Sequence, residues 1–220
     1  MRKNVKLAID SFWAGVMIAI SSILYLATSV LGLAGQIVGA FLFSGALLTI
    51  CWFKMKLFTG VIGYVRTLHQ AWRAILVLVW NLIGTLSIKC FAHMIPDSAL
   101  QAGTTTFLSK LGMNYGWHTT FFAAVLCGIL IYIAVEQYKQ GRAYAILLAV
   151  PAFVLSGARH CIAEFCYMLV AGSWSWRCLL YMTIVIAGNS LGALLLSLWE
   201  EHRNSLSTPK QEENNENSGH

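Results

Sequence analysis

The residues best suited to chemistry in this sequence lie within one apolar segment, residues 151–172, PAFVLSGARHCIAEFCYMLVAG. Arg159 and His160 stand at its centre, and Glu164 follows four residues after His160. An unperturbed imidazole titrates near pH ~6.5, so His160 can donate a proton to a passing anion or carry a positive charge beside it. Such a donor lowers the penalty that a bare anion meets in an apolar constriction. This segment therefore suggests assistance to a weak-acid anion.

Glu164 and Arg159 each have two interpretations that the sequence leaves open. Glu164 lies one helical turn beyond His160, so its carboxylate can accept the ring N–H or form a salt bridge with Arg159. Arg159 is either a selectivity charge for an anion or only the partner of that carboxylate. Ionisable residues inside membrane segments are rare and usually functional, which favours a functional role for His160.

A second polar interruption, CWFKMKLFTG, occupies residues 51–60. Lys54 and Lys56 can attract anions into a vestibule, or their side chains can reach toward lipid headgroups. Thr59 can cap a helix that starts after the interruption and can also line a pore. The position of the two lysines at a break in an apolar run favours the vestibule.

Two other motifs suggest chemistry that the context excludes. Residues 188–192, GNSLG, fit the G-x-S-x-G pattern of serine hydrolases, but that motif needs a turn between a strand and a helix. Here it lies inside a continuous apolar stretch. His160, Cys161 and Cys166 match no usual zinc spacing and lack a fourth ligand. We therefore predict no catalytic residue, no metal and no cofactor.

The composition places the chain in a membrane. Of its 220 residues 58% are hydrophobic and 11% are charged, against about 25% charged in soluble domains. The first apolar stretch is too long for a signal peptide and is predicted as a membrane span. The long apolar stretches predict six spans, at residues 9–30, 37–53 running on to about 68, 72–92, 119–138, 143–171 and 177–199.

The charges predict the orientation. The positive-inside rule favours cytoplasmic termini in the inner membrane, and this arrangement makes a nucleic-acid partner unnecessary to explain the net charge of +6. Residues 205–220 are polar and are predicted to form a disordered cytoplasmic tail. Nine basic residues fall on the inner side (Arg2, Lys3, Lys6, Arg66, Arg73, Lys139, Arg142, Arg203 and Lys210) and three on the outer side (Lys89, Lys110 and Arg177).

The six spans divide into two halves. Spans 3 and 6 each carry an N-x-x-G pattern, and the middle span of each half is interrupted. An interrupted helix is tolerated only where it lines a cavity or is buried in protein, and paired breaks mark a transport site near the midplane. We predict an all-α membrane domain over 1–204, with inverted three-helix repeats at about 7–92 and 117–200. The four repeat residues are Asn81, Gly84, Asn189 and Gly192.

The segments LFTGVIGYV (57–65) and VPAFVLSGARHCIAEF (150–165), with the two N-x-x-G helices, resemble the formate/nitrite transporter family over nearly all of residues 7–200. The resemblance implies an aquaporin-like fold with broken second and fifth helices, a homopentamer, and one pore in each protomer. Thr59 and His160 match the pore threonine and the central histidine of the family. The apolar residues that match its constrictions are Phe43, Leu47, Phe58 and Phe153.

The same resemblance implies a substrate class. Members pass small monovalent anions such as formate, nitrite, hydrosulfide or short carboxylates, some of them together with a proton. This chain departs from the family pattern at Arg159, where an acidic residue is usual, and at Glu164, where asparagine is usual. Lys54 and Lys56 also stand where the family has a small and an acidic residue. The alternatives are an aquaporin-like neutral-solute channel and an intramembrane hydrolase; the sequence lacks the Asn-Pro-Ala motif of the former.

Overall fold

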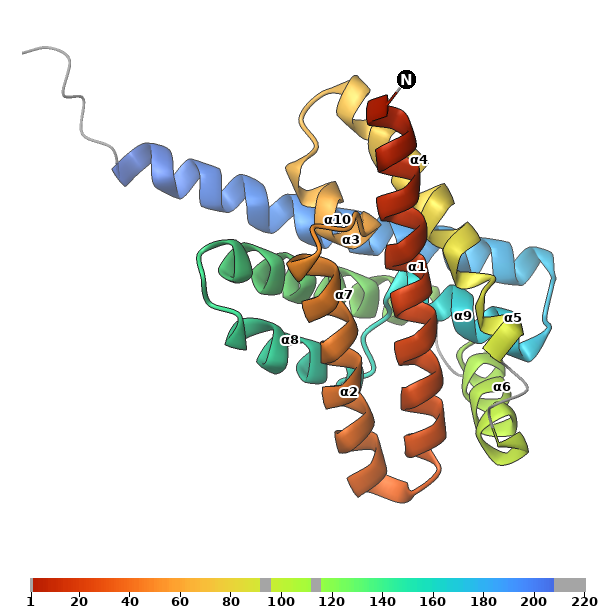
Figure 1. Cartoon of the computed structure of the whole chain (residues 1–220). Helices are drawn as coiled ribbons and strands as arrows, with labels where there is room; N and C mark the ends of the chain where they lie inside the picture. Colours follow the sequence, from red (N-terminus) through yellow and green to blue (C-terminus); the bar gives the residue numbers. More distant parts are fainter. Residues whose placement is uncertain (1, 92–95, 112–115, 208–220) are drawn as a thin grey trace, which may run out of the picture.

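The computed structural model describes residues 2–91, 96–111 and 116–207; the remaining residues, including most of the predicted tail, lie outside this description. All regular secondary structure in the described part is helical (Figure 1). The elements are α1 Arg2–Ser29, α2 Gly32–Trp52, α3 Phe58–Val61, the 3-10 helix η1 Ile62–Tyr64, α4 Leu68–Thr85, α5 Ile88–Phe91, α6 Asp97–Leu111, α7 Trp117–Lys139, α8 Tyr144–Leu155, α9 Cys161–Ala171 and α10 Trp176–Ser207.

Five described helices are long and apolar enough to cross a membrane: α1, α2, α4 with its extension to Cys90, α7 and α10. The predicted broken span at 143–171 forms two shorter apolar helices, α8 and α9. Figure 1 shows α1 beside α2, and α7 beside α8. The chain is therefore an all-helical, multi-pass membrane protein.

Several boundaries differ from those expected from hydropathy. Helix α4 begins at Leu68, four residues before the predicted span, because Thr67 and Gln70 form a capping box. Helix α10 continues to Ser207, past the predicted start of the tail at residue 205. Helix α6 was not predicted as an element. It buries Ala99, Gly103 and Phe107, which repeat every four residues along one face.

The two interruptions have the same backbone geometry. In each, a helix ends with one residue in the left-handed region, and three residues without regular structure lead into the next helix; the last of the three, Leu57 or His160, is extended. The left-handed residue is Lys54 (φ 56°) in the first break and Gly157 (φ 73°) in the second. Two hydrogen bonds close each helix end: Met55 N–H to Ile50 O (2.9 Å) and Lys54 N–H to Cys51 O (3.1 Å) in the first, Ala158 N–H to Phe153 O (3.0 Å) and Gly157 N–H to Val154 O (3.3 Å) in the second.

Asn81 on α4 holds the extended residues of the first break. Its side-chain oxygen accepts a hydrogen bond from the backbone N–H of Phe58 at 2.8 Å. Its amide group donates to the carbonyl of Ser11 at 2.7 Å and to the carbonyl of Lys56 at 2.8 Å. The side chain is fully buried, so it satisfies backbone groups that have no water to bond.

Asn189 on α10 holds the second break with the same set of bonds. Its oxygen accepts from the N–H of Cys161 at 2.9 Å. Its amide group donates to the carbonyls of Ala124 (2.8 Å) and Arg159 (2.7 Å). Two residues 108 positions apart in the sequence thus make the same three kinds of contact. Each bonds the two sides of one interruption to a long neighbouring helix.

Gly84 and Gly192, the glycines of the two N-x-x-G patterns, lie where two helices approach each other closely. A Cβ atom at Gly84 would overlap the carbonyl oxygen of Phe12 on α1, and one at Gly192 would overlap that of Val125 on α7. Only glycine leaves room for the neighbouring backbone at these positions. The close packing brings the two asparagines within reach of the breaks.

Candidate functional site

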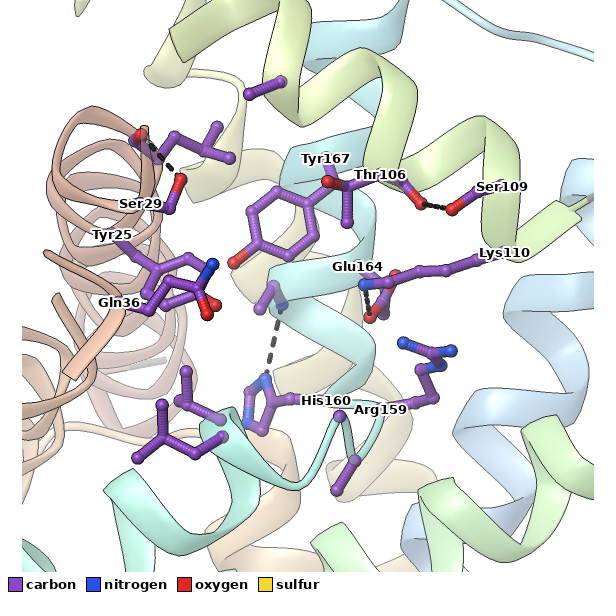
Figure 2. Close-up of a pocket in the computed structure, with 17 residues that line it drawn as sticks. Tyr25, Ser29, Gln36, Thr106, Ser109, Lys110, Arg159, His160, Glu164 and Tyr167 are labelled. Carbon is purple, nitrogen blue, oxygen red and sulfur yellow. Dashed lines mark hydrogen bonds and ion pairs between the residues drawn. The ribbon is translucent and has the colours of Figure 1, made fainter. Parts of the chain in front are cut away.

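The two breaks lie between two cavities. One cavity of about 420 Å³ is lined by residues of α1, α2, α6, α8 and α9, including Arg159 and His160; we call it the Arg159 cavity (Figure 2). The other, of about 440 Å³, is lined by residues of α2, α3 and α7 and by Lys54 and Lys56; we call it the Lys54 cavity. The two share no lining residue. Of the four residues predicted to narrow the pore, Leu47 lines the Lys54 cavity.

His160 is the last residue before α9, and both of its ring nitrogens are engaged. The Nδ1 atom accepts a hydrogen bond from the N–H of Ala163 at 3.3 Å and caps the helix. The Nε2 atom lies 3.0 Å from Oγ1 of Thr59 on α3. Because Nδ1 accepts, a neutral ring carries its proton on Nε2, which then donates to Thr59. The structure thus joins the two predicted pore residues, one from each break.

This geometry rules out one of the two interpretations of Glu164 and the predicted capping role of Thr59. Neither ring nitrogen of His160 faces Glu164, so the carboxylate does not accept the ring N–H. Thr59 is not a capping residue, because the residue before α3 is Leu57 and no side chain caps that helix. The Thr59 hydroxyl is buried against His160 instead.

The four apolar side chains predicted to narrow the pore, Phe43, Leu47, Phe58 and Phe153, are all buried. The ring of Phe153 stacks on His160 with centroids 5.9 Å apart and meets Phe43 edge-on at the same distance. Phe58 is buried next to Thr59, and Leu47 borders the Lys54 cavity. The His160–Thr59 contact therefore lies beside buried apolar side chains.

Glu164 lies in the Arg159 cavity and is bonded on both carboxylate oxygens. Lys110 of α6 lies 2.6 Å from Oε1, and the hydroxyl of Tyr181 donates to Oε2 at 2.9 Å. The Lys110 ammonium also lies 5.0 Å from the ring centre of Tyr167. Figure 2 shows Arg159 on the same wall as this ion pair. Two cations and one carboxylate line the cavity, so its charge is positive.

The Lys54 cavity carries three lysines, Lys54, Lys56 and Lys139, and none of the described residues that line it is acidic. The Nζ atom of Lys139 lies 3.5 Å from Oε2 of Glu136 and 3.4 Å from the ring centre of Tyr64. Lys54 and Lys56 thus both line this cavity, and their role as a vestibule for anions stays a prediction. The positive-inside rule placed Lys139 on the inner side and Lys110 on the outer side, and neither lysine was predicted to line a cavity.

The structure offers no support for hydrolysis or metal chemistry in its described part. The hydroxyl of Ser190 donates to the carbonyl of Ile186 one turn earlier in α10 and meets no base. No group of three or more His, Cys, Asp or Glu side chains in the described ranges could hold a metal ion. The arrangement places two cavities, each lined by more basic than acidic described side chains, next to a buried apolar cluster that contains the His160–Thr59 contact.

Comparison with known proteins agrees with this geometry. The formate channel FocA of Haemophilus influenzae is 24% identical over 181 residues; the match covers 72% of this chain and 63% of that protein. Two solved structures share the fold. A pentameric formate channel with formate bound has a TM-score of 0.78 at 17% identity and covers 93% of this chain and 98% of its own. An FNT family ion channel has a TM-score of 0.77 at 18% identity, over 94% and 92%.

The sequence profile described as formate/nitrite transporter matches residues 1–201. The match includes both breaks, both asparagines and all the helices that line the two cavities. The chain therefore belongs to the formate/nitrite transporter family.

Proposed function

We propose that this protein is a channel for small monovalent weak-acid anions, such as formate, nitrite, hydrosulfide or short carboxylates, and not an enzyme. The observation that carries the proposal is the hydrogen bond that joins His160, in the wall of the Arg159 cavity, to Thr59, the residue before Gly60 in the wall of the Lys54 cavity. Membership in a transporter family and similarity to formate channels support it.

Passage begins with attraction of the anion into a positive cavity. Arg159 and Lys110 provide the charge on one side, partly offset by Glu164, and Lys54 and Lys56 provide it on the other. Basic residues around a narrow entrance raise the local concentration of anions. The four apolar residues of the constriction then exclude water, so the anion needs a donor at that point.

The His160–Thr59 pair provides that donor. With the Nε2 proton directed at the Thr59 oxygen, the threonine hydroxyl proton is available to the anion. A second proton on Nδ1 would break the hydrogen bond to Ala163, so the ring gives up a helix cap when it becomes a cation. We infer that the anion receives its proton, or a strong hydrogen bond, through this pair and crosses the apolar passage close to its neutral form.

The experiment that tests this function measures anion-driven flux in proteoliposomes between pH 5 and 8 for wild type and H160N. Asparagine is a good helix cap, so H160N keeps the bond to Ala163 but lacks a group that reaches Thr59. We expect flux of one or two weak-acid anions that rises as pH falls and is lost in H160N. The pair T59S and T59V is the matched control, since only serine keeps the hydroxyl. Wild-type flux that H160N leaves unchanged would remove the histidine mechanism.

We also infer the arrangement in the membrane. The equal bonding of Asn81 and Asn189 supports inverted repeats over about 7–92 and 117–200. The pentamer of the solved formate channel supports a homopentamer in the lipid bilayer of the inner membrane, with both termini cytoplasmic. Apolar side chains exposed along α1, among them Val5, Ile9 and Trp13, provide surface for lipid or a neighbouring protomer. Native mass spectrometry of the purified protein tests the pentamer.

A further inference from the structure

The Lys54 cavity has more positive charge than its walls neutralise. Three lysines line it, and none of the described residues in its walls is acidic. Among the described residues, neither Lys54 nor Lys56 forms an ion pair. In the Arg159 cavity, by contrast, the ammonium group of Lys110 lies 2.6 Å from the carboxylate of Glu164. The positive charge of the Lys54 cavity is therefore the less compensated of the two.

The three lysines come from two elements that meet at this cavity. Lys54 and Lys56 belong to the first break, and Lys139 is the last residue of α7. The charge of Lys56 is near enough to that of Lys139 to repel it. Glu136 contacts Lys139 at 3.5 Å but does not line the cavity. An anion bound between like charges relieves their repulsion, and one with two charges relieves it more.

The backbone at Lys54 indicates that its side chain has a function. Lys54 has φ 56°, the one positive value at a non-glycine residue in the described ranges. The corresponding residue of the second break is Gly157, which adopts the left-handed conformation without strain. A strained residue of this kind is reasonable ground for a functional hypothesis. A lysine at this position is accounted for if its ammonium group binds a ligand in the cavity that it lines.

The cavity also has the size and the lining of a ligand site. Its volume of about 440 Å³ falls in the range of about 300 to 1,000 Å³ that is typical of pockets for small molecules. Such pockets are mostly apolar, and a few polar groups fix the ligand in them. Apart from the lysines, most of the lining is apolar and includes Leu47, Ile50 and Val135. The cavity thus has room for a group larger than one small anion.

We propose that the Lys54 cavity binds a dianion, a phosphate group or the similar sulfate, through Lys54, Lys56 and Lys139, and that the bound dianion blocks the passage of monovalent anions. Two charges attract a dianion to the lysines more strongly than one charge attracts a monoanion. The dianion does not move on, because gaining one proton leaves it charged, and burial of an unpaired charge carries a large penalty. The proposal rests on the proposed function, since it adds an inhibitor site to the same pathway.

Isothermal titration calorimetry of the purified protein with sulfate tests the binding without any flux. We expect one site per protomer at low ionic strength. The variant K54G/K56Q should raise the Kd at least about tenfold, because it removes two charge-assisted hydrogen bonds. The matched variant K3Q/K89Q should keep the wild-type Kd, since neither lysine lines this cavity. Titrations with inorganic phosphate and phenyl phosphate at pH 8 distinguish the sources of the group: tighter binding of phenyl phosphate identifies an organic phosphate, and equal or weaker binding identifies free phosphate.

Formate flux into proteoliposomes tests the block, with sulfate on both sides of the membrane so that the direction of insertion does not matter. At about ten times the calorimetric Kd, sulfate should lower wild-type flux about tenfold, as occupancy of one site requires. The same sulfate concentration should lower the flux of K54G/K56Q less than about twofold, relative to that variant without sulfate.

The possible outcomes separate this proposal from the proposed function. Absent binding, binding that K54G/K56Q does not weaken, formate flux that sulfate leaves unchanged, or passage of sulfate itself overturns the proposal and leaves the channel intact. Lysine-dependent binding of sulfate to a protein that carries no small anion would instead overturn the proposed function and keep the binding site.

Discussion

Replacing Asn189 by leucine tests how the second break is held in place. The change keeps the approximate volume of the side chain but removes all three hydrogen bonds of the amide. It leaves the N–H of Cys161 and the carbonyls of Ala124 and Arg159 without that partner in the protein interior. A buried polar backbone group left unbonded costs about 1 to 3 kcal/mol.

Some of this cost is recovered by relaxation, since Arg159 borders a cavity that can admit water. We therefore expect a loss of about 3 to 5 kcal/mol in the free energy of unfolding, which corresponds to about 6 to 20 °C in Tm for a chain of this size. Asn81→Leu should cost a similar amount, because Asn81 makes the same three bonds at the first break.

The assay is thermal unfolding in detergent followed with a thiol-reactive dye. Cys127, Cys161 and Cys166 are free and buried, so they react only when the helices separate. Ser190→Ala is the control, since its hydroxyl bonds only within its own helix. Hydrogen bonds between side chains of membrane helices average about 0.6 kcal/mol. A loss below about 2 kcal/mol for Asn189→Leu would therefore show that the amide adds nothing beyond such ordinary bonds, and the reasoning would be refuted.

Three further predictions concern the charges and the close helix contact. Lys110→Gln leaves the Glu164 carboxylate buried without its lysine and should lower the free energy of unfolding by about 3 to 5 kcal/mol in the same dye assay. Replacing both Lys110 and Glu164 by methionine should recover most of this loss, because no unpaired charge is then buried. Lys54→Gly should raise the stability by about 1 kcal/mol, by removing the strain at φ 56°, and yet lower flux by removing a vestibule charge; unchanged flux would deny that charge a role. Gly192→Ala should lower Tm and reduce flux together, because its Cβ would overlap the carbonyl of Val125; a variant with wild-type stability would contradict the close packing.

Most of the membrane fold could be predicted from the sequence because apolar length is its main determinant. Spans such as 119–138 correspond closely to α7 because a membrane helix needs about 20 apolar residues, wherever it packs. The breaks could be located because a lysine or an arginine interrupts an apolar run only where protein or a cavity surrounds it. Helix α6 was missed because it is too short and too rich in threonine to signal a span.

The site was predicted less completely, for a physical reason. His160 and Thr59 could be named because each sits in a break motif, but their contact joins residues 101 positions apart and depends on how the two halves pack. The partner of Glu164 depends on α6 lying against α9, which brings Lys110 to the carboxylate. The spacing along the sequence suggested only Arg159 and His160 as partners of the Glu164 carboxylate, because both lie within about one helical turn of it. Side-chain contacts between segments far apart in the sequence cannot be predicted from local residue spacing.

The two breaks share their backbone bonds but differ in the side chains that these bonds present. Leu57 lies between the backbone groups held by Asn81, in the position that His160 has between those held by Asn189. The amide bonds act on the main chain, so they position the break whatever side chain stands there. One half can therefore present a leucine side chain at this position while the other presents an imidazole. In the proposed passage the imidazole and the Thr59 hydroxyl that it contacts are the polar groups, and Leu57 adds no further one. The proposed function therefore depends on the difference between Leu57 and His160 more than on the symmetry around them.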